Sequence, residues 1–119
     1  QKWRNRMFKH YLTYHFASGF ERLCIGAQFN KTLERDELIR CSRNVALFFE
    51  KAIRATDTKE SAKNLFVALT YLRDCKDVMD RNEIHTWEIR THYQVLCGRL
   101  ETLFWESSEA DQGQLRMLG

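Results

Sequence analysis

The sequence contains no proline and only five glycines among its 119 residues. Strand-rich domains need frequent turns, and proline and glycine are the residues that punctuate turns most strongly. Their scarcity therefore argues against a β-rich fold and favours long helices. The length is that of a single domain, and a chain of this size can bury a substantial core without disulfides or metals to stabilise it.

Motifs that would identify an enzyme are also missing. The chain has no H-E-x-x-H pattern, no phosphate-cradling glycine loop and no G-x-S-x-G nucleophile elbow. None of its cysteines forms a C-x-x-C pair, which argues against a structural zinc site. Acidic side chains are interspersed with basic ones at helical pairing distances, as on an ordinary solvated surface. We therefore predict no catalytic residues, no metal and no cofactor.

No apolar run approaches the ~18 residues that a membrane-spanning helix requires. No basic and then apolar signal peptide is present either. We expect no membrane association. The first residue is glutamine rather than methionine, and we interpret the chain as a domain excised from a larger protein.

Two apolar heptad stripes follow one another between residues 62 and 104. The first consists of Leu65, Leu69, Leu72, Cys75 and Met79, and the second of Ile89, Tyr93, Leu96, Leu100 and Leu103. Steps of three and four residues place each stripe on one face of a helix. The polar segment 80–83 between them predicts a tight turn that starts the second helix. Such a short connection makes the two helices antiparallel.

The remaining apolar residues predict two or three further helices. A helix over 2–18 would turn Trp3, Met7, Tyr11 and Tyr14 inward, and Ser18-Gly19 would end it before a second segment from Phe20. A helix over 33–55 would bury Leu38, Cys41, Val45, Phe48 and Ala52. Asp57 with Glu60 forms a capping pattern for the first helix of the 62–104 pair, which should end near Met79.

We expect the last helix to end near Trp105, with Gly98 as a candidate for a close helix crossing. These patterns predict an all-α fold, an antiparallel bundle of four to five helices with short loops. We assign residues 1–106 to this domain and 107–119 to a polar tail or linker.

The four cysteines leave two interpretations open. Their even number would allow two disulfides in a secreted protein. Their neighbourhood of core leucines instead favours buried free thiols and an intracellular protein, nuclear or cytoplasmic. Asn30-Lys31-Thr32 matches a glycosylation acceptor pattern, so a secreted four-helix-bundle ligand remains an alternative.

The main functional hypothesis is a non-enzymatic interaction domain, a scaffold, adaptor or dimerisation module that binds another protein or itself. Three consecutive residues cover about 200° around a helix axis. Apolar runs such as 47–49 and 65–67 are therefore too wide for all their side chains to be buried against one neighbouring helix. Surplus rings of this kind often mark partner sites. The predicted contact residues are Trp3, Phe49, Phe66, Trp87 and Trp105.

The opening helix supports an alternative, a nucleic-acid-binding bundle. Lys2, Arg4, Arg6 and Lys9 precede the first acidic residue and alternate with aromatic side chains. Bases neutralise phosphates and aromatic rings stack on nucleobases. An amphipathic helix with its rings in the core is the simpler interpretation, because four charges make a modest electrostatic surface.

Overall fold

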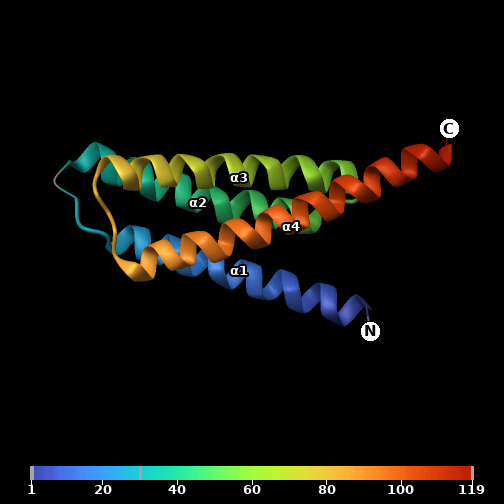
Figure 1. Cartoon of the computed structure of the whole chain (residues 1–119), viewed down its shortest axis with the longest axis horizontal. Helices are drawn as coiled ribbons and strands as arrows, with labels where there is room; N and C mark the ends of the chain where they lie inside the picture. The colour runs from blue at the N-terminus through green and yellow to red at the C-terminus, as the bar shows by residue number, and fades with distance from the viewer. Residues whose placement is uncertain (1, 30, 119) are drawn as a thin grey trace.

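The structure is a computed structural model that describes residues 2–29 and 31–118, with side chains described in 9–29 and 31–109. It contains α1 (Lys2–Gly26), α2 (Thr32–Arg54), α3 (Thr58–Arg81) and α4 (Trp87–Leu118) in the described chain. The helices run up and down in sequence, and α1 contacts both α2 and α4 while α3 also contacts both (Figure 1). This confirms the predicted all-α antiparallel bundle, and no strand occurs in the described ranges.

The core lies along the common axis of the four helices and is almost entirely apolar. Burial of such side chains supplies most of the stabilisation of a bundle. The core residues are Ala17, Phe20, Cys24, Leu38, Cys41, Val45, Phe49, Ala52, Leu65, Ala68, Leu72, Cys75, Val78, Met79, Ile84, Ile89, Leu96 and Leu100.

The predicted hairpin of α3 and α4 is confirmed, together with its first cap. The Asp57 carboxylate accepts a hydrogen bond of 2.7 Å from the backbone N–H of Glu60, which satisfies one of the free donors at the start of α3. The boundary between the two helices is wrong in the prediction, however. The α3 helix continues to Arg81, and α4 begins only at Trp87.

A Schellman motif ends α3 in place of the predicted turn. The N–H of Ile84 donates to the carbonyl of Met79 at 2.9 Å, and the N–H of Glu83 donates to Asp80 at 3.3 Å. Glu83 occupies the left-handed position with φ of 54°, where glycine is the usual residue. Ile84 is buried, which adds the hydrophobic contact that often accompanies this motif. The chain therefore reverses at 82–86.

The prediction for α1 is wrong in two respects. The helix does not stop at Gly19, which is buried inside it against the His92 ring at ordinary contact distance. Its inward face carries Thr13, Ala17, Phe20 and Cys24, whereas Tyr11 and Tyr14 are exposed. Burying this second set outweighs the glycine penalty of about 1 kcal/mol in a helix interior. The prediction took Gly19 as a helix end and did not recognise that the buried face of α1 continues past this residue.

Three smaller differences concern α2 and α4. Phe49 rather than Phe48 continues the buried face of α2, because the steps from Val45 to Ala52 are four and three. Gly98 is exposed with no atom within 4 Å of an added Cβ, so it marks no close crossing. The α4 helix continues to Leu118, past its predicted end near Trp105. The domain division after residue 106 stays a prediction.

The two ends of the bundle differ in shape (Figure 1). At one end, which we call the loop end, lie the α1–α2 connection at 27–31 and the α3–α4 connection at 82–86. At the other, the groove end, lies the α2–α3 connection at 55–57. The first part of α1 and the last part of α4 diverge there, and α4 extends beyond its neighbours (Figure 1).

Candidate protein-interaction surface

Exposed aromatic rings gather near the groove end on α3 and α4. Phe66 is 57% exposed and Trp105 is 62% exposed. Phe104 lies between them, with its ring centroid 5.9 Å from that of Phe66 and 5.4 Å from that of Trp105. Large rings cost free energy when they face water, so two exposed rings joined by the partly buried Phe104 are a candidate contact surface.

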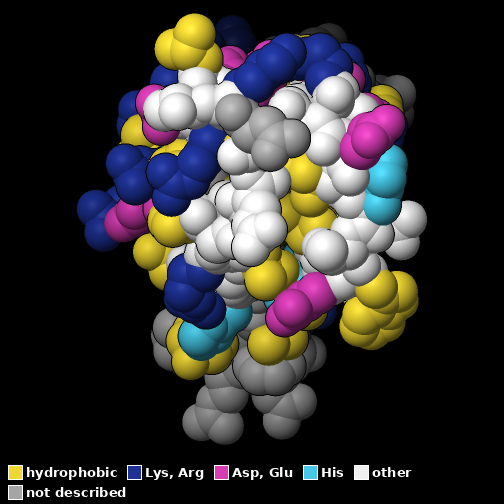
Figure 2. All heavy atoms as spheres, turned by 90° about the vertical axis from the view of Figure 1, so that its left-hand side faces the viewer, with side chains coloured by type: hydrophobic (Ala, Val, Ile, Leu, Met, Phe, Trp, Pro, Cys, Tyr) yellow, Lys and Arg dark blue, Asp and Glu magenta, His cyan; other side chains and the backbone are white. Residues whose placement is uncertain are grey.

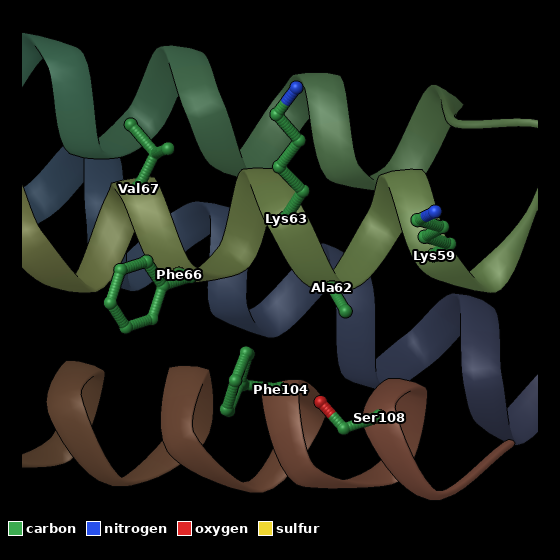
Figure 3. A pocket seen from close by; sticks show the side chains of 7 residues that line it. All are labelled: Lys59, Ala62, Lys63, Phe66, Val67, Phe104 and Ser108. Carbon is green, nitrogen blue, oxygen red and sulfur yellow. The ribbon is translucent and has the colours of Figure 1, made fainter. Parts of the chain in front are cut away.

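A shallow groove of about 500 Å³ opens at these rings, between α3 and α4. Phe66 and Phe104 point toward one another across it, and the small side chains of Ala62 and Ser108 face each other one turn further along (Figure 3). The residues that define this α3–α4 groove are Lys59, Ala62, Lys63, Phe66, Val67, Phe104 and Ser108.

The charged residues of the α3–α4 groove are both lysines. Lys59 and Lys63 are exposed and lie one helical turn apart on α3. Neither makes an ion pair within the part of the chain whose side chains are described. The surface therefore combines apolar rings with two lysines that form no ion pair among the described side chains, and its described lining includes no histidine, carboxylate or thiol.

The predicted contact residues do not form one site. Phe66 and Trp105 come together through Phe104, but Phe49 is 1% exposed and belongs to the core, which corrects its assignment. Trp87 is 81% exposed at the start of α4, at the loop end. At a rise of 1.5 Å per residue it lies about 27 Å from Trp105. The Trp3 side chain lies outside the described residues.

Sequence reasoning missed Phe104 and the two groove lysines. A signal for the phenylalanine pair was available, because Phe66 and Phe104 lie at similar distances along the chain from the α3–α4 connection. Residues equidistant from the turn of an antiparallel hairpin face one another. The lysines lacked such a signal, because their charge stands out only when the partners of all other charges are known.

The loop end carries a different surface. Basic side chains, interspersed with acidic ones, gather along its upper and left borders in Figure 2, while hydrophobic side chains appear in separate groups.

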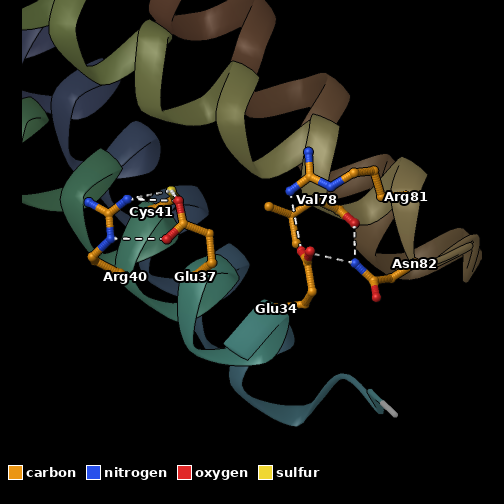
Figure 4. Close-up of polar contacts among 7 residues, drawn as sticks. All are labelled: Glu34, Glu37, Arg40, Cys41, Val78, Arg81 and Asn82. Atoms are coloured by element: carbon orange, nitrogen blue, oxygen red, sulfur yellow. Dashed lines mark hydrogen bonds and ion pairs between the residues drawn. The ribbon is translucent and has the colours of Figure 1, made fainter. Parts of the chain in front are cut away.

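Arg81 Nη2 of α3 lies 3.2 Å from Glu34 Oε2 of α2, and Asn82 Nδ2 donates to the same oxygen at 3.4 Å (Figure 4). Arg90 of α4 pairs with Asp80 of α3 at 2.8 Å. We call these contacts the polar clasp.

Some carboxyl groups at the loop end are held in their charged form. Lys76 and then Arg90 hydrogen-bond Asp80 and lower its pKa below the ordinary value. Arg40 does the same for the pKa of Glu37, to which it donates two hydrogen bonds (Figure 4). Structural ion pairs of this kind explain the shifts without a catalytic role.

The cysteines are free thiols, as predicted, and only Cys97 is partly exposed. Burial raises the pKa of Cys24 to about 12 and that of Cys97 to about 11. A hydrogen bond with Cys41 and burial raise the pKa of Cys75, while the same bond lowers the pKa of Cys41, which has no exposed surface. Reactive cysteines are accessible thiolates, and none of these thiols meets both requirements.

The nucleic-acid hypothesis depends on side chains that are mostly outside the described residues. Lys2, Arg4 and Arg6 fall there, and Lys9 is exposed on α1. The exposed Tyr11 ring lies edge-on to His15, with centroids 4.6 Å apart. The rings of this helix therefore are not all in the core, and the hypothesis stays a prediction.

Two other kinds of site are absent from the described residues. No group of three or more histidine, cysteine, aspartate or glutamate side chains there is placed to hold a metal ion. In the same part of the chain, no helix has the length and apolar character needed to cross a membrane. No family model matches the sequence, and comparison with curated proteins and with solved structures finds no match.

Proposed function

We propose that this protein is a non-enzymatic interaction module that binds another protein through the α3–α4 groove and the adjacent Trp105. The observation that supports this most directly is the set of three neighbouring rings, two of them more than half exposed, around an apolar groove. Exposed aromatic clusters are the usual energetic centres of protein interfaces. The described lining of the groove includes no histidine, carboxylate or thiol that could activate Ser108 or a lysine.

We further propose that the module is a scaffold or adaptor domain of a larger intracellular protein, nuclear or cytoplasmic. Free cysteines in the core support this setting, because small secreted domains usually rely on disulfides. A homodimer through the same groove is the competing form of the proposal. In both forms Phe66 and Trp105 carry the contact.

Binding by groove variants tests the proposal. Light scattering of the purified chain establishes whether it associates with itself, and affinity capture from cell extract identifies proteins that it retains. We expect Phe66→Ala combined with Trp105→Ala to lose at least tenfold of the binding, since interface aromatics often contribute 2 kcal/mol or more. Trp87→Ala, which removes a still more exposed ring at the loop end, is the matched control.

Two results would contradict the proposal. One is a monomer that captures no protein. The other is a captured protein that binds the double variant and the wild type equally well, which would assign contact to another surface. Circular dichroism must show the same helical content in all variants.

A further inference from the structure

We infer that the partner of the α3–α4 groove is an amphipathic helix with an acidic flank, which lies over α3 beside Lys59 and Lys63. This inference rests on the proposed function and specifies the chemistry of the partner. It follows from the secondary structure of the groove walls, from the shape of the floor, and from the charges on the two rims.

The walls favour a helical partner over an extended one. Both walls are helices, so their backbone N–H and C=O groups already pair within α3 and α4. An extended peptide would find no open sheet edge on which to add a strand, and its own backbone groups would lack partners where it covers the groove. A helix satisfies its backbone internally and presents only side chains to the groove.

The floor has the relief that such a helix needs. Phe66 and Phe104 form a bulky apolar pair, whereas Ala62 and Ser108, one turn away, have small side chains that leave more space (Figure 3). Apolar side chains spaced at i, i+3 or i+4, and i+7 would cover the rings and fill this space. Small residues in the floor let the partner backbone approach closely.

The α3 rim supplies the charge complementarity. Lys59 and Lys63 lie on the α3 side of the rings, and neither has an acidic partner among the described side chains. Elsewhere on the same helix, Lys76 is paired with Asp80 at 2.8 Å. Two unpaired ammonium groups one turn apart match two carboxylates one turn apart on a partner helix.

The α4 rim fixes which flank is acidic. Glu101 and Glu109 are exposed and lie four residues before and after Trp105, on the same side of α4. Carboxylates of a partner would be repelled there. The acidic flank of the partner therefore lies over α3, while its opposite flank over α4 is neutral or basic.

Selection from a helical peptide library tests this inference with the full 119-residue chain. The displayed peptides share a fixed stripe of leucine and phenylalanine at i, i+4, i+7 and i+11, and their flanking positions are random. We expect the retained peptides to carry aspartate or glutamate on one flank only. Selected peptides are then measured for affinity by fluorescence anisotropy at low and moderate salt.

The combined variant Lys59→Glu and Lys63→Glu should bind these peptides about tenfold more weakly, and the loss should shrink at higher salt. Arg22→Glu combined with Lys31→Glu is the matched control, because it reverses two exposed charges away from the groove. It should change affinity less than about twofold, as expected for charges beyond the screening length.

The outcomes separate this inference from the proposed function. If the retained peptides have neutral or basic flanks and bind Phe66→Ala more weakly than the wild type, the groove is still the interface. The inference of an acidic partner is then wrong. No retained peptide at all overturns the inferred partner, and peptides that bind Phe66→Ala as well as the wild type overturn both the inferred partner and the groove as the interface. A dimer that Phe66→Ala dissociates assigns the groove to a second copy of the chain and overturns the inferred partner.

Discussion

The loop end and the groove end of this bundle are built on opposite principles. At the loop end, polar side chains join one element to the next: Arg35 of α2 donates to the Ile25 carbonyl of α1, and Arg90 of α4 pairs with Asp80 of α3. At the groove end, Phe66 and Trp105 face outward, and two lysines have no acidic partner among the side chains that the structure describes.

This difference separates stability from binding. Polar contacts between helices fix the register of a bundle while adding modest stability each. Exposed rings add little to stability and offer a partner the apolar area that drives association. Substitutions at the loop end should therefore mainly change the free energy of unfolding, and those at the groove end should mainly change partner binding.

The largest expected effect distinguishes a core ring from a groove ring. Phe49→Ala should lower the free energy of unfolding by about 3–5 kcal/mol, because it leaves a cavity in a packed core. Phe66→Ala removes the same atoms from a half-exposed position and should cost about 1 kcal/mol or less. Urea unfolding followed by circular dichroism measures both.

Equal losses in the two variants would contradict the comparison, since they would show Phe66 to be structural. Where both variants remain folded, Phe66→Ala should weaken partner binding more than Phe49→Ala does. Loss of binding in Phe66→Ala at unchanged fold would sharpen the assignment of the groove end to recognition.

Much of this arrangement could be predicted from the sequence, because heptad spacing fixes which face of a long helix is buried. The stripe from Leu65 to Met79 was correct for that reason, and the Asp57 cap was correct because an aspartate side chain can accept the backbone N–H three residues on. The errors arose where a local signal competed with packing. Gly19 suggested a helix end, yet the buried face of α1 continues through it, and a penalty of about 1 kcal/mol is smaller than the gain from burying Phe20.

The candidate site was predictable only in part. Phe66 and Trp105 stood out as surplus rings, but so did Phe49, and the choice between Phe48 and Phe49 depends on how α2 is rotated against its neighbours. Heptad spacing allows either. The isolation of Lys59 and Lys63 is a property of the whole surface and becomes visible only in three dimensions.

The second prediction concerns the turn that holds the loop end together. Glu83 has φ of 54°, a conformation that costs a side chain with a Cβ roughly 1 kcal/mol and glycine almost nothing. Glu83→Gly should therefore raise the free energy of unfolding by about 0.5–1 kcal/mol. Glu83→Ala is the control, because it removes the charge and keeps the Cβ. If both variants gain the same stability, the cause is the loss of the negative charge at the end of α3 rather than relief of the backbone conformation.

The smallest expected effect is the response of the polar clasp to acid. Hydrogen bonds from Lys76 and Arg90 lower the pKa of Asp80 in the folded state, so the folded protein binds this proton less readily than the unfolded chain. Its contribution to stability is therefore complete above the ordinary aspartate pKa and is lost as pH falls through the lower, folded-state value. Asp80→Asn should lower the thermal midpoint slightly at pH 7, and the difference from wild type should vanish in acid.

Asp77→Asn provides the control for this response, since Asp77 is an exposed aspartate of the same helix with no ion pair among the described side chains. It should match the wild type across the pH range. The segment 65–69 of α3 supplies the internal reference, because it contains no titratable side chain. Acid should therefore shift the amide NMR signals of 76–90 while leaving those of 65–69 in place, and equal shifts in both segments would show that α3 opens as a whole.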